Sequence, residues 1–265
     1  MGERVLLDIE DRVATLRLDN PPLNVIDTEM REALARTVGR LAVAEDVHAV
    51  VVTGSERAFA AGADVEGLAA MGFEEIWSWN RALQRTFTEV AALPMPVIAA
   101  IEGHALGGGL ELALCADHRI AGDRASLAQP EVLLGILPGS GGTQRLARLV
   151  GPSRTKELLM TGRRVRPDEA AAIGLVDRVV PAGTALQEAQ RFARELAAGP
   201  QFALQAIKLA VDKGSDGPLE VGLALERSLI AGLFATRDRD AGMRSFLQDG
   251  PGKARFGQPP PDASR

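Results

Sequence analysis

Short, strongly apolar segments alternate with helical segments along the first two-thirds of the chain, and this alternation is the strongest constraint on its fold. Three of the short segments cover residues 50–52, 96–101 and 118–121. A continuous apolar run of this length is typical of a strand buried on both faces, as in a parallel sheet. Such strands are joined by helical crossovers. The sequence therefore predicts an α/β fold.

Local signals place further elements around these strands. Asp27 can cap a helix, because its carboxylate can accept from the first turn, and the glycines at 107–109 open another helix that continues to Cys115. The remaining predicted elements are a hairpin over residues 5–9 and 13–18, helices over 28–44, 68–92 and 168–173, and a strand over 176–180.

Beyond residue 199 the pattern becomes purely helical, with predicted helices over 203–213, 219–234 and 239–247. We therefore expect an α/β core over residues 1–199 and a helical region with a Gly- and Pro-rich tail over residues 200–265. A helical extension on an α/β core often packs against a partner chain, so we expect an oligomer.

Composition narrows the class of partner and compartment. The formal net charge of −5 argues against a general nucleic-acid surface. Cys115 is the only cysteine, which rules out an intrachain disulfide, and its apolar neighbours favour a packing role. No apolar run approaches the roughly 18 residues that span a bilayer, and the charged N-terminus has no signal core. A cytoplasmic protein without a membrane partner is the expectation.

Two glutamates stand at marked turns and are the best candidates for chemistry. Glu111 follows three glycines inside an otherwise apolar run, and Glu131 follows Pro130. Two carboxylates can divide acid and base work between them. The alternative for Glu111 is a buried ion pair with Arg119 or Arg145, and the alternative for Glu131 is an exposed turn residue.

Small residues near these glutamates predict an anion held by backbone amides. Gly108, in the glycine run, and Ala63, in the segment from Phe59 to Asp64, could each present an N–H to a ligand oxygen. Two such donors make an oxyanion hole, and removing one typically costs about 3–4 kcal/mol of transition-state stabilisation. The alternative is that the glycines only let a helix approach a strand.

Other site classes fit the sequence poorly. Ser140 lies in a Gly-rich loop, but Pro138 replaces the glycine that a nucleophile elbow needs. Dinucleotide fingerprints fail because Leu112 and Gln144 stand where their last glycine would be. His104 could line a pocket, and we favour that over a role as general base. No spacing of His, Asp and Glu resembles a metal site, so no metal is expected.

Taken together, the motifs resemble those of the enoyl-CoA hydratase/isomerase (crotonase) superfamily. The segments that carry the resemblance occur in order along the chain, and the resemblance extends from Val5 to about Phe256. They are Ala58-Phe59-Ala60-Ala61-Gly62-Ala63-Asp64, the stretch from Pro96 to Leu112, Ala128-Gln129-Pro130-Glu131, and the stretch from Leu134 to Arg145. The joint pattern is specific, although each piece alone is weak.

The resemblance implies a spiral of β-β-α units, a helical C-terminal region that drives formation of trimers, often paired as hexamers, and an acyl-CoA substrate. It places Glu111 and Glu131 on the two catalytic glutamates, and the N–H groups of Ala63 and Gly108 on the thioester oxygen. Ala61 falls where the family contacts the adenine. Coenzyme A is part of the substrate, so no separate cofactor is implied.

Because both glutamates are present, the resemblance favours hydration of a 2-trans-enoyl-CoA to a 3-hydroxyacyl-CoA. An isomerase or another acyl-CoA-transforming branch is the first alternative, and a non-catalytic acyl-CoA-binding subunit is the second.

Glu66 and Met95 stand at positions where many members of the family have a basic residue. The coenzyme A contacts are therefore assigned by position to residues near the motif and in the tail. They are Ala61, Gly62, Asp64, Arg57 and Lys253. Trp77 and Trp79 are candidates for the acyl pocket.

Overall fold

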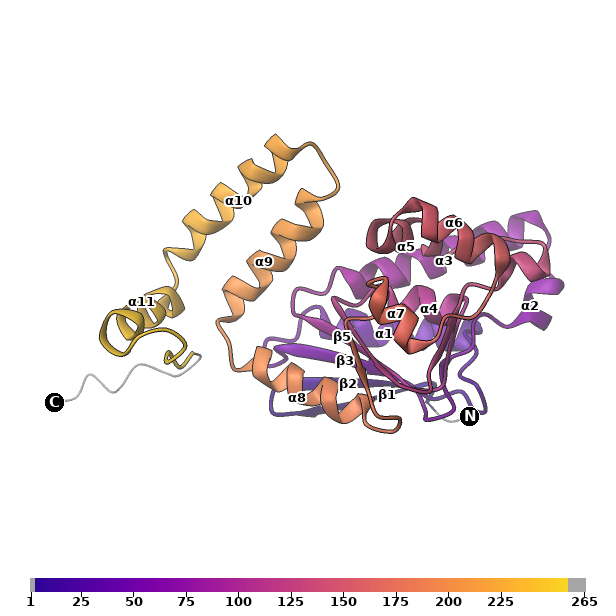
Figure 1. Ribbon diagram of the computed structural model, residues 1–265, viewed down its shortest axis with the longest axis horizontal. Coiled ribbons are helices and arrows are strands. Elements are labelled where there is room, and N and C mark those ends of the chain that lie inside the picture. The colour runs from indigo at the N-terminus through magenta and orange to yellow at the C-terminus, as the bar shows by residue number, and fades with distance from the viewer. Residues whose placement is uncertain (1–2, 257–265) are drawn as a thin grey trace.

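The computed structural model describes residues 3–256, so the part of the predicted tail beyond residue 256 lies outside the described residues. Strands and helices alternate through the first 200 residues, and helices alone follow (Figure 1). The strands are β1 (Val5–Glu10), β2 (Val13–Leu18), β3 (Ala49–Thr53), β4 (Ala58–Ala60), β5 (Val97–Ile101), β6 (His104–Leu106), β7 (His118–Gly122), β8 (Ser126–Ala128) and β9 (Arg178–Val180). The helices are α1 (Thr28–Leu41), α2 (Val65–Ala69), α3 (Phe73–Ala91), α4 (Gly108–Ala113), the 3-10 turn η1 (Glu131–Leu134), α5 (Gly142–Val150), α6 (Pro152–Thr161), α7 (Pro167–Ala172), α8 (Ala185–Ala197), α9 (Gln201–Gly214), α10 (Leu219–Leu233) and α11 (Arg237–Asp249).

The strands form two sheets that the chain visits in turn. A six-stranded sheet has the order β1-β2-β3-β5-β7-β9, with β1 and β2 antiparallel and the other pairs parallel. A three-stranded parallel sheet has the order β4-β6-β8. Each of the pairs β3–β4, β5–β6 and β7–β8 places one strand in each sheet before the next helix. This is the predicted spiral of β-β-α units.

The central strands of the six-stranded sheet, β3 and β5, are buried on both faces because they are apolar at successive positions. Val50 and Val52 of β3 point into the main core, whereas Val51 points to the opposite face. There α8 covers the sheet with alanines spaced four residues apart. They are Ala185, Ala189, Ala193 and Ala197, and all are buried. Side chains this small let the helix lie close to the strands.

The helix predicted over residues 68–92 is two helices, so that prediction is wrong in its first part. Helix α2 ends at Ala69, and α3 begins at Phe73 after Gly72. The backbone of Gly72 is extended, and its N–H donates to the carboxylate of Glu75 at 2.7 Å. That bond caps α3 at its first turn and sets its start.

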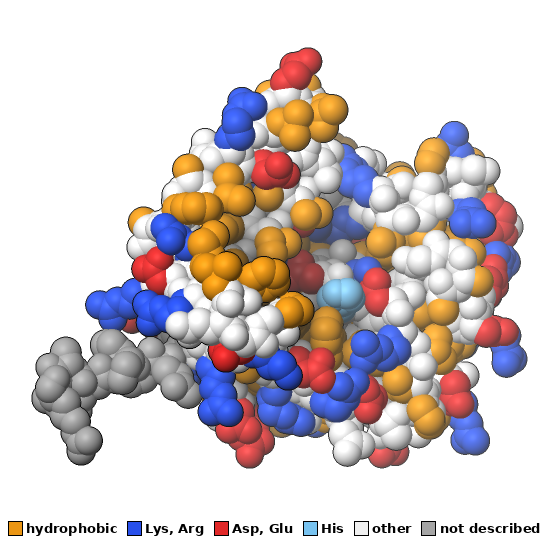
Figure 2. Space-filling model, turned by 60° about the vertical axis from the view of Figure 1, so that its left-hand side comes forward, with side chains coloured by type: hydrophobic (Ala, Val, Ile, Leu, Met, Phe, Trp, Pro, Cys, Tyr) orange, Lys and Arg blue, Asp and Glu red, His pale blue; other side chains and the backbone are white. Residues whose placement is uncertain are grey.

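The helices predicted after residue 199 are present. Lys208 anchors α9 to the core, because its ammonium donates to Asp117 at 2.8 Å and to the carbonyl of Met95 at 3.2 Å. Helices α10 and α11 extend away from the two sheets (Figure 1). Neither contains a buried residue, and both expose large apolar side chains such as Phe234 and Phe246. Hydrophobic side chains gather on the side of the molecule that carries these helices (Figure 2).

Residue 199 lies between the end of α8 and the start of α9, and the division of the chain into a core and a helical region at that point stays a prediction. No helix within residues 3–256 combines the length and the apolar character needed to cross a bilayer.

Candidate active site

Glu111 lies on α4 and is only 2% exposed. Its Oε1 atom accepts hydrogen bonds from the backbone N–H groups of Ser140 at 2.7 Å and Gly142 at 2.8 Å. Gly142 is the first residue of α5, so the carboxylate lies at the positive end of that helix. Glu111 forms neither of the two ion pairs considered from the sequence. Arg119 pairs with Asp177 at 3.0 Å, and the positive charge of Arg145 lowers the pKa of Glu111 without a direct contact.

Glu131 is the first residue of η1 and is 9% exposed, so the alternative of an exposed turn residue is wrong. Its neighbour Gln129 is also buried. With its amide nitrogen toward Glu131, Gln129 donates to both carboxylate oxygens at 3.2 Å. No other side chain of the described residues bonds to this carboxylate. The two glutamates therefore have different surroundings.

The two carboxylates meet at the turn formed by Gly107 and Gly108. A Cβ atom on Gly107 would lie 2.6 Å from Oε1 of Glu131, and one on Gly108 would lie 3.9 Å from Oε2 of Glu111. Gly107 also has a φ of 50°, which favours glycine. Glycine is therefore required at 107 both by the backbone and by the acid beside it.

The candidate oxyanion hole lies at the same turn. A Cβ on Gly108 would lie 3.7 Å from the backbone nitrogen of Ala63, and one on Gly62 would lie 3.8 Å from the nitrogen of Gly108. Gly108 is the first residue of α4, so its N–H has no partner within the helix. In the described part of the chain, the N–H of Ala63 makes no hydrogen bond within the protein. Two amides beside one small space can bind one oxygen.

Burial raises the pKa of both carboxyls. For Glu111, loss of solvation is the largest cause, and the two backbone N–H groups and the charge of Arg145 oppose it. For Glu131, loss of solvation and the nearby charge of Glu111 raise the pKa to about 7. Donors aimed at Glu111 favour its ionised form. The pKa of Glu131 therefore lies close to neutral pH, and the donors at Glu111 oppose the effect of burial on that carboxyl.

A cavity of about 940 Å³ contains both glutamates. Its walls come from the β4–α2 connection, the Gly107 turn, α3 and the segment from Pro130 to Ser140. Of the residues predicted to act on the substrate, the cavity is lined by Ala61, Gly62, Ala63, Gly108, Glu111 and Glu131. Trp77 and Trp79 also line it. The indole N–H of Trp79 donates to Thr28 at 3.2 Å, which fixes that ring.

Three predicted coenzyme A contacts do not line this cavity. Asp64 is half-buried at the start of α2. Arg57 is exposed between β3 and β4, and Lys253 is exposed beyond α11. Helix α11 lies at the far end of the molecule from α2 (Figure 1). The roles assigned to them stay predictions.

The structure adds residues that the sequence did not assign to the site. The hydroxyl of Ser140 donates to the side-chain oxygen of Asn80 at 3.2 Å, while Asn80 and Gln84 both donate to the carbonyl of Gly139 at 2.9 and 2.6 Å. Ser140 thus contributes its backbone N–H to Glu111 and uses its hydroxyl in the scaffold. A glycine-rich loop opening a helix was the available signal, because such loops present N–H groups to an anion.

Cys115 has the predicted packing role. It is buried, its thiol donates to the carbonyl of Glu111 at 3.3 Å, and burial raises its pKa to about 12. A thiol with such a pKa stays protonated at neutral pH. It supports the turn of α4 that carries Glu111.

Known proteins share both the sequence and the fold. Residues 8–258 match the family described as enoyl-CoA hydratase/isomerase. A probable enoyl-CoA hydratase of Mycobacterium tuberculosis is 38% identical over 93% of this chain and 95% of its own. A crotonyl-CoA hydratase of Syntrophomonas wolfei is 37% identical over 93% and 95%. The crystal structure of an enoyl-CoA hydratase from Bacillus anthracis is 37% identical, with a TM-score of 0.89 over 92% of this chain and 96% of that one. The chain belongs to the enoyl-CoA hydratase/isomerase family.

Proposed function

We propose that the protein catalyses the hydration of a 2-trans-enoyl-CoA to a 3-hydroxyacyl-CoA. One observation carries this proposal: Glu111 and Glu131, held by different segments, line one cavity at the Gly107–Gly108 turn. Relatives named enoyl-CoA hydratase and crotonyl-CoA hydratase support the choice of substrate. The substrate carries its own coenzyme A, and the reaction as proposed uses no other cofactor.

The thioester oxygen accepts hydrogen bonds from the N–H groups of Ala63 and Gly108. As water adds to C3 of the substrate, negative charge moves through the conjugated system onto this oxygen. Donors fixed at that position bind the charged, enolate-like state more strongly than the neutral carbonyl. The backbone therefore lowers the barrier without taking part in proton transfer.

The two carboxyls carry the protons of the addition. Ionised Glu111 accepts a proton from water while the water oxygen bonds to C3, and protonated Glu131 gives its proton to C2. The double bond is consumed, and the product gains one hydroxyl and one hydrogen. Glu111 is then protonated and Glu131 ionised, so a proton must return to Glu131 before the next turnover. Because both carboxyls act from one side of the bound substrate, the addition is syn.

The coenzyme A part of the substrate extends from the thioester along the β4–α2 connection. Ala61 and Gly62 line the cavity there and offer backbone groups to the adenine. Asp64 follows them, and Arg57 is the proposed cation for the phosphates within the same chain. Lys253 lies beyond α11, which is far from this connection (Figure 1), so its proposed phosphate contact is with the substrate bound to another copy of the chain in the proposed oligomer. Replacing Arg57 with Gln is expected to raise KM for crotonyl-CoA without changing kcat.

A homotrimer, or a hexamer built from two trimers, is the proposed assembly. This assembly is supported by the large apolar side chains that α9, α10 and α11 expose, including Phe202, Phe234 and Phe246. Large exposed apolar patches usually mark a surface that a partner covers. Light scattering during size exclusion tests the proposal. A mass near 28 kDa, that of one chain, would contradict it.

The direct test is the loss of ultraviolet absorbance when the purified protein is mixed with crotonyl-CoA, because hydration destroys the conjugated thioester. Glu111→Gln and Glu131→Gln are each expected to lower kcat by about 10²–10⁴-fold without unfolding the protein. Glu102→Gln is the matched control: Glu102 also accepts two backbone N–H groups, from Gly183 at 2.9 Å and Ala185 at 3.0 Å, but it does not line the cavity.

Two results would count against hydration. A variant of Glu111 or Glu131 that keeps wild-type turnover would remove that residue from the mechanism. An isomerase would be favoured by two results together: the protein converts a 3-enoyl-CoA, and it causes no loss of absorbance with 2-enoyl-CoA substrates of several acyl lengths. No conversion of either kind would favour a binding subunit.

A further inference from the structure

Residues 162–166 connect α6 to α7, and two of them, Gly162 and Val165, lie against the segment that carries Glu131. Val165 forms an antiparallel bridge with Leu127 of β8, with N–H to carbonyl distances of 2.7 and 3.2 Å in the two directions. Strand β8 leads directly through Gln129 and Pro130 into Glu131. The connection is therefore bonded to the backbone immediately before the acid.

Gly162 makes the second contact, with η1 itself. Its φ is 62°, and a Cβ at this position would lie 3.3 Å from the Cα of Pro130 and 3.1 Å from Cγ of Leu133. A side chain at this position would press on Pro130 and Leu133, which would have to shift by a few tenths of an ångström. Pro130, which precedes η1, and the side chain of Leu133 in η1 thus pack closely against Gly162 at the end of α6.

The turn that carries Glu131 has little other support. It is a single 3-10 turn of four residues, and Leu133 and Leu134 are 71% and 54% exposed. Gly107 lies against the carboxylate of Glu131, and Gly162 lies against Pro130 and Leu133. A shift of residues 162–165 would therefore move Glu131.

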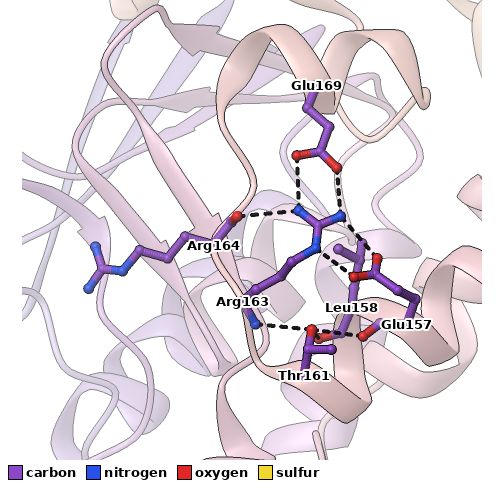
Figure 3. A network of polar contacts seen from close by, with 6 residues as sticks. All are labelled: Glu157, Leu158, Thr161, Arg163, Arg164 and Glu169. Carbon is purple, nitrogen blue, oxygen red and sulfur yellow. Dashed lines mark hydrogen bonds and ion pairs between the residues drawn. The ribbon is translucent and has the colours of Figure 1, made fainter.

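Arg163 fixes this connection with two bidentate ion pairs (Figure 3). Its Nε and Nη2 donate to the carboxylate of Glu157 on α6 at 2.6 and 2.9 Å, and its Nη1 and Nη2 donate to that of Glu169 on α7 at 2.9 and 2.6 Å. The backbone N–H of Arg163 also donates to the hydroxyl of Thr161 at 3.3 Å. One guanidinium therefore joins both helices across the connection.

We propose that Arg163 is a positioning residue for Glu131: by joining α6 and α7 it holds residues 162–165 against β8 and η1, and so sets where the Glu131 carboxyl meets the substrate. The kinetic part of this inference rests on the proposed function. Partly exposed ion pairs contribute little to global stability, whereas a misplacement of about 1 Å at a catalytic group can cost up to about 100-fold in rate. The effect of Arg163 is thus expected in kcat.

The test compares Arg163→Gln with Arg191→Gln. Arg191 also pairs with two glutamates, Glu188 and Glu195, but it does so along the surface of α8, away from the cavity. With crotonyl-CoA, Arg163→Gln is expected to lower kcat about tenfold and to leave KM within about twofold. Arg191→Gln is expected to change neither. Arg163→Lys, which can keep single bonds to both glutamates, is expected to restore part of kcat.

A second measurement is independent of catalysis. Amide hydrogen exchange over residues 129–134 is expected to accelerate in Arg163→Gln and to stay unchanged in Arg191→Gln. The double variant Glu157→Gln with Glu169→Gln is expected to reproduce both effects, and adding Arg163→Gln to it is expected to change nothing more, since the same interactions are already gone.

Wild-type kcat together with wild-type exchange in Arg163→Gln would overturn the inference. Faster exchange spread evenly over the whole chain would overturn it as well, since that result is general destabilisation. If the wild-type protein hydrates no enoyl-CoA, the proposed function fails, and the exchange comparison still decides whether Arg163 holds the turn.

Discussion

The backbone N–H of Ser140 donates a 2.7 Å hydrogen bond to the carboxylate of Glu111, a residue 29 positions earlier in the chain. This bond joins Glu111, the proposed catalytic base, to the loop of Gly139 and Ser140, and that loop is in turn bonded to α3. Asn80 donates to the carbonyl of Gly139 at 2.9 Å and accepts from the hydroxyl of Ser140 at 3.2 Å. Helix α3 therefore holds the loop whose N–H groups donate to Glu111.

Replacing Asn80 with Ala is expected to raise the pKa of Glu111, because a looser loop donates less well to the ionised carboxylate. A base with a higher pKa is less ionised at low pH, so kcat should fall more at pH 6 than at pH 8. The pH profile of kcat measures this shift. Ser140→Ala keeps the backbone N–H and should shift the profile less. Equal loss at every pH in Asn80→Ala would contradict the link.

The rate should fall as the pH rises through about 7, where Glu131 loses the proton that it gives to C2. The profile of kcat/KM with crotonyl-CoA measures this alkaline limb for the free enzyme. The limb should be absent from the residual activity of Glu131→Gln, since the amide does not titrate. Its persistence in that variant would assign the limb to another group.

Stability should also depend on the charge of Glu131. The pKa of Glu131 is raised in the folded protein, so protonation of this carboxyl favours folding. The resulting gain in the free energy of unfolding is fully present below pH about 4.5, the pKa in the unfolded chain, and is lost as the pH rises through about 7. Glu131→Gln should therefore be more stable than wild type at pH 8.5, by an amount on the order of 3 kcal/mol, and no more stable at pH 4. Urea unfolding at the two pH values tests this. An equal difference at both would exclude the charge as its cause.

Gly107→Ala should damage catalysis more than stability. The new Cβ would lie 2.6 Å from Oε1 of Glu131, so the acid must move, and kcat should fall by about 100-fold. The φ of 50° adds a backbone cost of about 1 kcal/mol. Gly174 is the control, because it has a φ of 78° with nothing near its Cβ position. Gly174→Ala should lose similar stability and keep its activity. Equal activity in the two variants would contradict the contact.

The strands of the large sheet were predictable because their apolar runs are long enough to show the pattern. Those of the small sheet are three residues each, too short for a visible period, and the sequence did not indicate them. Helix α8 was also missed, since its buried face consists of alanines. The break between α2 and α3 depends on one capping bond from Gly72 to Glu75, a local event inside a helical pattern.

The amino-acid sequence alone identified the family motifs, the α/β class and the two glutamates. Each motif is a short contiguous segment of glycine, proline and carboxylate residues, so it can be recognised in the sequence without the fold. Only the tertiary structure decided how the two acids differ. Glu111 gains N–H donors from residues 140 and 142, whereas Glu131 lies against Gly107 with the Gln129 amide as its side-chain donor. Protonation depends on solvation and on donors brought together from distant segments, and no local run of residues contains that information.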